Sequence, residues 1–135
     1  MLAPRREKFR KQFRGKRRGV AIRGSELAFG EVGLKSLGRG WMSAAQIEAG
    51  RRAITNALKR KGRTWVRVFP DKPITLRPAG QRMGSGKGEV DHHAAVILPG
   101  KIIYEIAGVE PEVAANALKK AGDKISFKAK IVYRN

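Results

Sequence analysis

Two segments of the chain place their apolar residues at the period of an α-helix. The first covers residues 44–61, where the apolar positions share one face at 100° per residue and are Ile47, Ile54, Ala57 and Leu58. Ser43 and Gln46 have the spacing of a capping box, and Gly62 is a typical residue beyond a helix end. The pattern therefore predicts a helix over residues 44–61 with Gly62 as its stop.

The second helical segment begins at a proline and ends at a glycine. Pro111 suits the first turn of a helix, where its missing N–H has no partner to lose, and Gly122 suits the end. The apolar stripe between them consists of Val113, Ala114, Ala117, Leu118 and Ala121. We predict the second helix between these two boundaries.

Alternating apolar and polar positions predict β-strands elsewhere in the chain. Residues 65–69 alternate, residues 74–76 begin another short strand, and residues 125–133 alternate strictly. Residues 25–40 indicate one or two short strands that glycines interrupt. Trp65 is expected in the core or at its edge.

A β-hairpin is predicted between the glycine-rich segment and the second helix. Residues 94–98 have the composition of a buried strand, Pro99 and Gly100 form a turn, and residues 102–106 alternate on the return. Strands and helices in this order predict an α+β fold with two helices packed on a mixed or antiparallel β-sheet. A length of 135 residues fits one such domain, expected over residues 25–135.

Charge adds a second region to this picture. The chain has 30 Lys and Arg against 11 Asp and Glu, a formal net charge of +19. Residues 1–24 are a basic arm with one acidic residue, and its cations are Arg5, Arg6, Lys8, Arg10, Lys11, Arg14, Lys16, Arg17, Arg18 and Arg23. So large a surplus favours nucleic acid as the partner, with an anionic membrane surface as the second option.

The arm has two interpretations. It buries little and repels itself, so it is expected to be disordered when free, and a solvated tail is the plainer interpretation. The favoured one is an arm that becomes ordered along RNA phosphates, because arginine suits bidentate phosphate contact. Phe9 and Phe13 stand four residues apart, so a short helix with both on one face is also expected.

Residues 79–91 are rich in glycine and are predicted to form a long loop in the domain. The loop does not match the phosphate-binding loop G-x-x-x-x-G-K-[ST], because Gly88 stands where Ser or Thr would hold magnesium. It also lacks the G-x-G-x-x-G pattern followed by a helix. Small residues still let backbone amides approach phosphates, so the loop can lie along an RNA backbone.

The polar face of the first predicted helix adds further cations. Arg51, Arg52 and Lys59 lie in this segment, and Glu48 can pair with Arg52 one turn on. An ordinary solvated helix surface fits these residues, and so does an anion-binding surface. The neighbouring basic arm favours the anion-binding surface.

Catalytic and metal-binding patterns are not evident in the sequence. His92 and His93 are adjacent, and neighbours on a strand point to opposite faces, so they cannot bind one metal ion together. Cysteine is absent. The acidic residues are expected at helix ends or on the surface, including Glu105, Glu110, Glu112 and Asp123. We expect no enzyme, no metal and no cofactor. No apolar run predicts a membrane span or a secretory signal.

Four stretches of the sequence together resemble a known family. They are PRREKFRKQFRGKRRG in the arm, QIEAGRRAI in the first helix, WVRVFPDKPIT, and QRMGSGKG in the loop. On these residues the chain resembles the L-sixteen family of bacterial and organellar large-subunit ribosomal proteins, from Met1 to about Val132. Residues 82–88 match a signature of that family. The chain departs from the family pattern at Thr64, often aliphatic, and at residues 92–93, often an aromatic pair.

The resemblance implies a fold and a set of partners. The family's fold is two helices against a mixed sheet with a hammerhead-like β element. Its members bind large-subunit rRNA, join the subunit late and sit beside the aminoacyl-site tRNA, with the peptidyl-site tRNA close by. Neighbouring ribosomal proteins are further partners, and neither a membrane nor a second copy of the chain is expected. The implied location is the cytoplasm, in a bacterial ribosome, or the interior of an organelle.

The resemblance also assigns residues to the RNA interface. Arm residues 5–23 are implied to extend into rRNA. The loop is implied to reach toward the peptidyl-transferase region, where RNA catalyses peptide-bond formation. In some bacteria the arginine that corresponds to Arg82 is hydroxylated. The expected RNA-binding residues outside the arm are Arg51, Arg52, Lys59, Arg82, Met83, Gly84, Gly86, Lys87 and Gly88. The alternative function is a free-standing RNA-binding regulator or RNA chaperone that uses the same arm.

Overall fold

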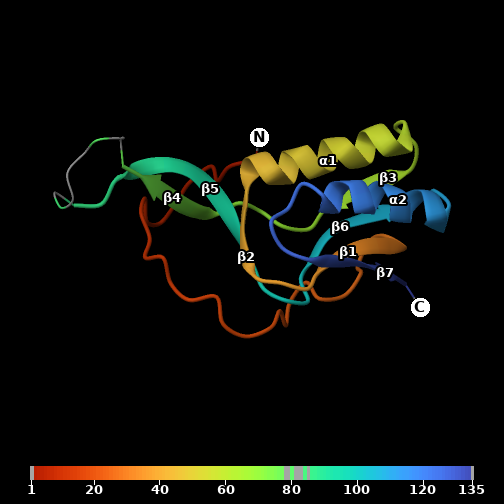
Figure 1. Cartoon of the computed structure of the whole chain (residues 1–135), viewed down its shortest axis with the longest axis horizontal. Coiled ribbons are helices and arrows are strands. Elements are labelled where there is room, and N and C mark those ends of the chain that lie inside the picture. The colour runs from red at the N-terminus through yellow and green to blue at the C-terminus, as the bar shows by residue number, and fades with distance from the viewer. Residues whose placement is uncertain (1, 78–79, 81–83, 85, 135) are drawn as a thin grey trace.

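Figure 1 shows the computed structural model of the chain, which describes residues 2–77, 80, 84 and 86–134. Two helices lie side by side over a four-stranded sheet, and a three-stranded sheet projects beyond them. In chain order the elements are β1 (Val32–Ser36), β2 (Gly40–Ser43), α1 (Ala44–Leu58), β3 (Arg63–Val66), β4 (Lys72–Leu76), β5 (Glu89–Ile97), β6 (Ile102–Ala107), α2 (Pro111–Gly122) and β7 (Ala129–Tyr133). This arrangement confirms the predicted α+β class.

The strands form two sheets with the orders β3-β6-β1-β7 and β2-β5-β4. Each pairing between described strands is antiparallel, so the sheet is not mixed. In the four-stranded sheet, Leu34 of β1 lies opposite Tyr104 of β6 and Ile131 of β7. β6 is buried along nearly its whole length. It is an inner strand, and both α2 and the segment around residues 28–30 contact it.

The predicted hairpin of residues 94–98 and 102–106 is wrong. β5 pairs with β2 and β4, whereas β6 pairs with β1 and β3, so the turn at Pro99–Gly100 leads from one sheet to the other. The backbone groups at this turn bond to the end of β1. Gly100 N–H donates to Ser36 O, and Ser36 N–H donates to Lys101 O, each at 2.8 Å. A turn pattern specifies where the chain bends but not which strands then pair.

Helix α1 begins as predicted and ends earlier. Ser43 and Gln46 form the full capping box. The helix stops at Leu58, three residues before the expected end, because Lys59 and Arg60 take left-handed conformations with φ of 52° and 65°. Their N–H groups bond back to carbonyls in the last turn of the helix, as in other left-handed helix ends.

Helix α2 spans Pro111–Gly122, as predicted. Its buried residues are Ala114, Ala115, Ala117, Leu118 and Ala121. Val113 was expected in this stripe but is 44% exposed, and Ala115 was not expected there. The helix contacts both α1 and the sheet, so its buried face is wider than one stripe and is turned away from Val113.

Other boundaries shift by a few residues. β5 begins at Glu89, so the last residues of the expected 79–91 loop lie in a strand. β7 begins only at Ala129, although Ile125 and Phe127 still pack on the core. Residues 2–24 contain neither helix nor strand, so the short helix expected around Phe9 and Phe13 is absent from the described arm.

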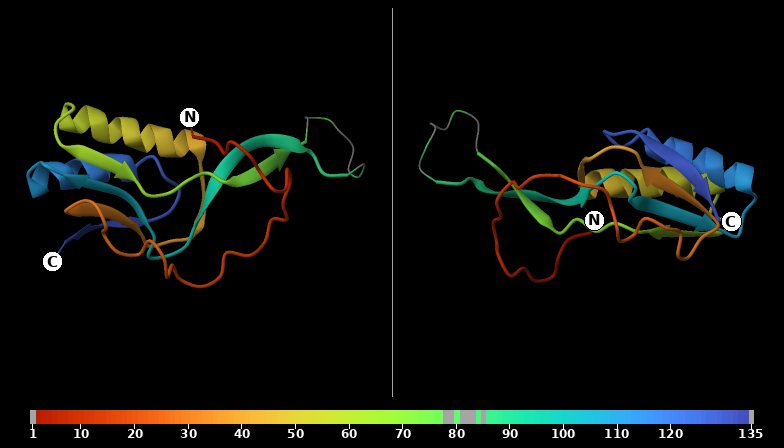
Figure 2. Two further views of the ribbon diagram at one scale, coloured as in Figure 1. Left: turned by 180° about the vertical axis from the view of Figure 1, so that it is seen from behind. Right: turned by 90° about the horizontal axis from the view of Figure 1, so that it is seen from below.

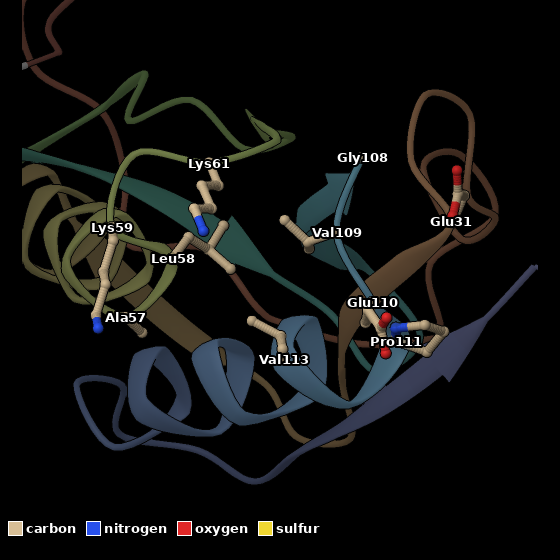
Figure 3. Close-up of a pocket in the computed structure, with 10 residues that line it drawn as sticks. All are labelled: Glu31, Ala57, Leu58, Lys59, Lys61, Gly108, Val109, Glu110, Pro111 and Val113. Carbon is tan, nitrogen blue, oxygen red and sulfur yellow. The ribbon is translucent and has the colours of Figure 1, made fainter.

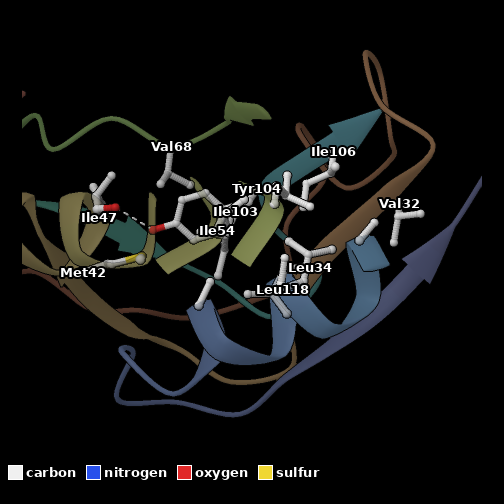
Figure 4. Close-up of a cluster of buried hydrophobic side chains, with 14 of the residues drawn as sticks. Val32, Leu34, Met42, Ile47, Ile54, Val68, Ile103, Tyr104, Ile106 and Leu118 are labelled. Carbon is white, nitrogen blue, oxygen red and sulfur yellow. Dashed lines mark hydrogen bonds between the residues drawn. The ribbon is translucent and has the colours of Figure 1, made fainter. Parts of the chain in front are cut away.

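The core lies between the helices and the four-stranded sheet, with Ile54, Ile103 and Leu118 near its centre (Figure 4). Tyr104 reaches from β6 to α1, where its hydroxyl donates to Ile47 O at 2.7 Å. Burial raises the pKa of this hydroxyl, so it remains a neutral donor. Gly50 makes the crossing possible, because a Cβ at residue 50 would overlap the Tyr104 ring and hydroxyl.

We expect Gly50→Ala to lower the free energy of unfolding by about 1–3 kcal/mol, because the new methyl displaces Tyr104 from a packed core. Gly122→Ala is the matched control, since nothing lies within 4 Å of a Cβ at that position. The control should be neutral or slightly stabilising, because alanine is the better helix former. Urea unfolding measures both. Equal stabilities would contradict the described contact.

Glu105 was expected on the surface, but its side chain is fully buried in β6. One carboxylate oxygen accepts hydrogen bonds from the N–H groups of Ala28, Phe29 and Gly30 at 2.9–3.0 Å. The other oxygen accepts from the Arg67 guanidinium. Gly30 fits because a Cβ there would stand 2.8 Å from Ile106 O. The carboxylate is thus held by a strap of residues 27–31 that crosses the sheet.

The same strap explains the position of Trp65. Its ring stacks on Phe29 with centroids 5.8 Å apart, and the Arg67 guanidinium lies 5.4 Å from the Phe29 centroid. Trp65 is therefore half-buried at the edge of the core, as predicted.

Burial by itself raises the pKa of Glu105, but the Gly30 N–H, the Arg67 guanidinium and the N–H groups of Phe29 and Ala28 together hold it below its ordinary value. A lowered pKa stabilises the fold above the ordinary glutamate pKa of about 4.3, and this stability is lost as the pH falls through the folded-state pKa.

We therefore expect Glu105→Gln to lower the free energy of unfolding at pH 7 by about 3 kcal/mol, because Arg67 loses its anionic partner. The variant should also lose less stability than the parent between neutral and acidic pH. Glu110→Gln, at an exposed position without a side-chain cap bond, serves as control. Urea unfolding across this pH range is the measurement, and parallel curves for parent and Glu105→Gln would refute the assignment.

Candidate nucleic-acid interface

The arm passes along the three-stranded sheet. Figure 2 shows it, in red, leaving the start of α1, crossing β4 and β5, and returning toward β1. Near its end, Ala21 N–H donates to Pro99 O at 2.9 Å. This route brings the most basic segment of the chain to the end of the molecule that carries the glycine-rich loop.

Cations of the folded part bind the arm backbone. Lys72 Nζ donates to Phe13 O at 2.9 Å and to Arg14 O at 2.7 Å. Lys87 Nζ donates to Gln12 O. In these contacts backbone carbonyl oxygens, and not carboxylates, accept the hydrogen bonds of the lysines, so no acidic side chain neutralises the two cations.

Two further bonds extend this contact. Lys11 Nζ donates to Lys87 O at 3.2 Å, and Arg39 donates to Arg17 O at 2.8 Å. Lys72 and Arg39 were not among the predicted site residues. Nothing in the local pattern marks them, because their role depends on an arm that is distant in sequence.

Most arm cations remain open to a ligand. Within the described part of the chain, six of them are exposed and make no hydrogen bond or ion pair, namely Arg5, Arg6, Arg10, Lys16, Arg18 and Arg23. Lys8 lies 5.6 Å from the Phe9 ring centroid, and Phe9 is itself exposed. The six unpaired cations can meet phosphates without first breaking a hydrogen bond or an ion pair in the protein.

The loop is only partly described. Arg82 and Met83 lie outside the described residues. Gly84 and Gly86 have φ of 98° and 88°, values that glycine adopts readily. Gly88 lies against β4, where a Cβ would stand 2.9 Å from Leu76 O. Lys87 contacts the arm, so the structure joins this loop residue to the arm.

The two adjacent histidines point to different surroundings, as predicted for neighbours on a strand. His92 Nδ1 lies 2.7 Å from Asp91 Oδ2 at an exposed position. His93 Nε2 contacts Glu7 of the arm and is only 19% exposed. Among the described residues, no three His, Asp or Glu side chains come together as a metal site would require.

The basic face of α1 is partly neutralised. Arg51 and Arg52 both contact Glu48, with Arg52 Nε 3.3 Å from Glu48 Oε1. The Arg51 hydrogen bond is the main reason that the pKa of Glu48 falls to about 2. Arg52 is still 73% exposed. Arg51 lies near the arm, because it lines the same pocket as Leu2.

Lys59 caps the C-terminal end of α1. It borders a groove between the end of α1 and the start of α2 (Figure 3). The groove is lined by apolar side chains together with Lys61, Glu31 and Glu110. The structure therefore places Arg51 beside the arm and Lys59 away from it, so the predicted cations of α1 do not form one surface.

Comparison with known proteins now decides the family. The model of the family described as ribosomal protein L16p/L10e matches residues 4–132. The chain belongs to this family. The resemblance seen in the sequence is thereby confirmed over nearly the whole chain, including the arm and the loop.

Two relatives illustrate the match. The chain is 55% identical over 134 residues to the large ribosomal subunit protein uL16 of Psychrobacter arcticus, covering 99% of this chain and 98% of the relative. It is 54% identical over 132 residues to the large ribosomal subunit protein uL16c of Tetradesmus obliquus, covering 98% and 96%. Among the described residues, no helix is both long and apolar enough to cross a membrane.

Proposed function

We propose that this chain is a structural constituent of the large ribosomal subunit, where it binds large-subunit rRNA and contacts tRNA near the aminoacyl site. The observation that carries the proposal is the family match over residues 4–132. Both relatives described above are named as large-subunit proteins. The net charge of +19 supports a polyanionic partner independently. Neighbouring ribosomal proteins complete the set of partners.

The arm supplies the main rRNA contacts. Its exposed arginines can each present two parallel N–H donors to a phosphate, and every neutralised phosphate releases condensed counterions. The glycine-rich loop extends the same surface, with Arg82 and Lys87 as its cations. We place this loop toward the peptidyl-transferase region, where RNA performs the chemistry, and assign no catalytic role to the chain. Arg82 is also the proposed position of hydroxylation.

The arm's contribution is measurable through salt. If it neutralises about seven phosphates, log K for RNA should fall with log salt at a slope of about −5 to −6. Deleting residues 1–19 should flatten this slope by more than half. Thermal unfolding should change little, because the large apolar side chains of the deleted segment, Leu2, Phe9 and Phe13, are exposed. A truncated protein with the parent's slope would show that the arm does not dock on RNA.

Arg82 offers a separate test of the loop. Under the proposal, Arg82→Ala leaves thermal unfolding unchanged but slows elongation or weakens aminoacyl-tRNA binding by ribosomes that contain it. Arg82→Lys restores only part of the function, because lysine lacks the planar fork. Should Arg82 instead pair with Glu89 or Asp91 within the protein and only shape the loop, Arg82→Ala would lower the melting temperature and Glu89→Ala would copy its effect. Ribosomes with Arg82→Ala that match the parent in both assays would overturn the loop's role.

A further inference from the structure

Three cations surround one tryptophan between the arm and the three-stranded sheet, and a fourth lines the same pocket. The Arg14 guanidinium, the Arg17 guanidinium and Lys72 Nζ lie 5.4, 5.1 and 5.4 Å from the Trp41 ring centroid. Lys87 lines the same pocket as Trp41, Arg14 and Lys72. We call these five residues the Trp41 cluster.

The sheet explains how Trp41 and Lys72 come together. In the order β2-β5-β4, Trp41 lies opposite Val96 and Lys72 lies opposite Ala94. Because Ala94 and Val96 are two residues apart, all four side chains are on one face of the sheet. The small Ala94 side chain leaves room for Lys72 to reach over β5 toward the indole.

The arm reaches the same point by a bend. Gly15 has φ of 72°, in the left-handed region that glycine adopts readily. The bend lets Arg14 and Arg17, on either side of it, approach the same indole. Lys72 holds the arm at the bend through the carbonyls of Phe13 and Arg14.

The cluster has more positive charge than its surroundings balance. Burial lowers the pKa of Lys72 first, and the charges of Lys87 and Arg17 lower it further, with only Asp71 opposing them. No described carboxylate bonds to any of the four cations. The Trp41 indole N–H is buried and makes no hydrogen bond. Like charges held this close repel each other until an anion neutralises them.

We propose that the Trp41 cluster is a binding site for one phosphodiester group of RNA, which bridges the arm to the three-stranded sheet. This inference rests on the proposed RNA-binding function and adds a site to it. Guanidinium groups match the oxygens of a phosphate geometrically, and lysine adds a point charge. The phosphate takes over Lys72 and Lys87 from the arm carbonyls and draws in Arg14 and Arg17, so RNA binding fixes the arm relative to the folded part.

Tryptophan fluorescence reports this event directly. The chain has two tryptophans, so the full-length Trp65→Phe protein keeps Trp41 as its single one. The substitution is distant from the cluster, because Trp65 stacks on Phe29 at the other sheet. A short single-stranded uridine oligonucleotide is titrated into it, and Trp41 emission is followed beside the anisotropy of a label on the RNA. We expect a saturable change in Trp41 emission that tracks binding.

The decisive variant is Lys72→Met, which removes the charge and keeps the length of the side chain. We expect it to weaken RNA binding about tenfold, as loss of a charge-assisted hydrogen bond does, and to flatten the salt slope by about 0.7. Lys124→Met is the matched control, because Lys124 is an exposed lysine beyond α2 with the same charge change. The control should bind like the parent. Arg17→Gln tests the arm side of the cluster without altering the sheet.

The outcomes separate this inference from the function beneath it. Loss of affinity in Lys72→Met and Arg17→Gln, with the control unchanged, supports the site. If both variants keep the parent's affinity and emission change while the RNA still binds, the cluster is not a phosphate site although RNA binding stands. Equal losses in all three variants would mean that only net charge matters, and this also overturns the site. A parent protein that does not bind RNA would instead refute the proposed function.

Discussion

The buried carboxylate of Glu105 is the interaction on which the arrangement of the molecule depends. It joins an inner strand to two connecting segments, namely the strap of residues 27–31 and Arg67. The strap follows the arm, and Arg67 lies between β3 and β4, so two of the connections between the core and the basic end of the molecule are fixed at one side chain. A single buried charge thus holds the segment that follows the arm and the segment that leads to β4.

Stability and charge are divided between two parts of the fold. The helices and the four-stranded sheet contain most of the buried apolar side chains, with Tyr104 and Gly50 locking α1 onto β6. The three-stranded sheet and the arm instead gather cations around Trp41 and at the loop. Loss of an arm cation can therefore weaken RNA binding with little cost to folding, which suits a surface that becomes ordered on a polyanion.

Local signals predicted local structure well. The capping box at Ser43 and the proline start of α2 are short-range patterns, and both helix starts are confirmed. The pairing of the strands was not predictable from local signals. The sequence of β5 and β6 is typical of a hairpin, but the two strands belong to different sheets. Glu105 was misjudged for the same reason, since only distant residues make its burial favourable. In the site, charge alone identified the arm, whereas Lys72 and Trp41 become visible only once the sheet and the arm are placed together.

The central claim is that this chain is a structural constituent of the large ribosomal subunit. The most direct test is its distribution in ribosomes of its source organism, separated by gradient centrifugation after a moderate-salt wash. We expect the chain to co-sediment with the large subunit in near-equal amount. A chain found mainly free of the subunit, or released by a wash that leaves other large-subunit proteins bound, would contradict the account and favour a free-standing RNA-binding regulator.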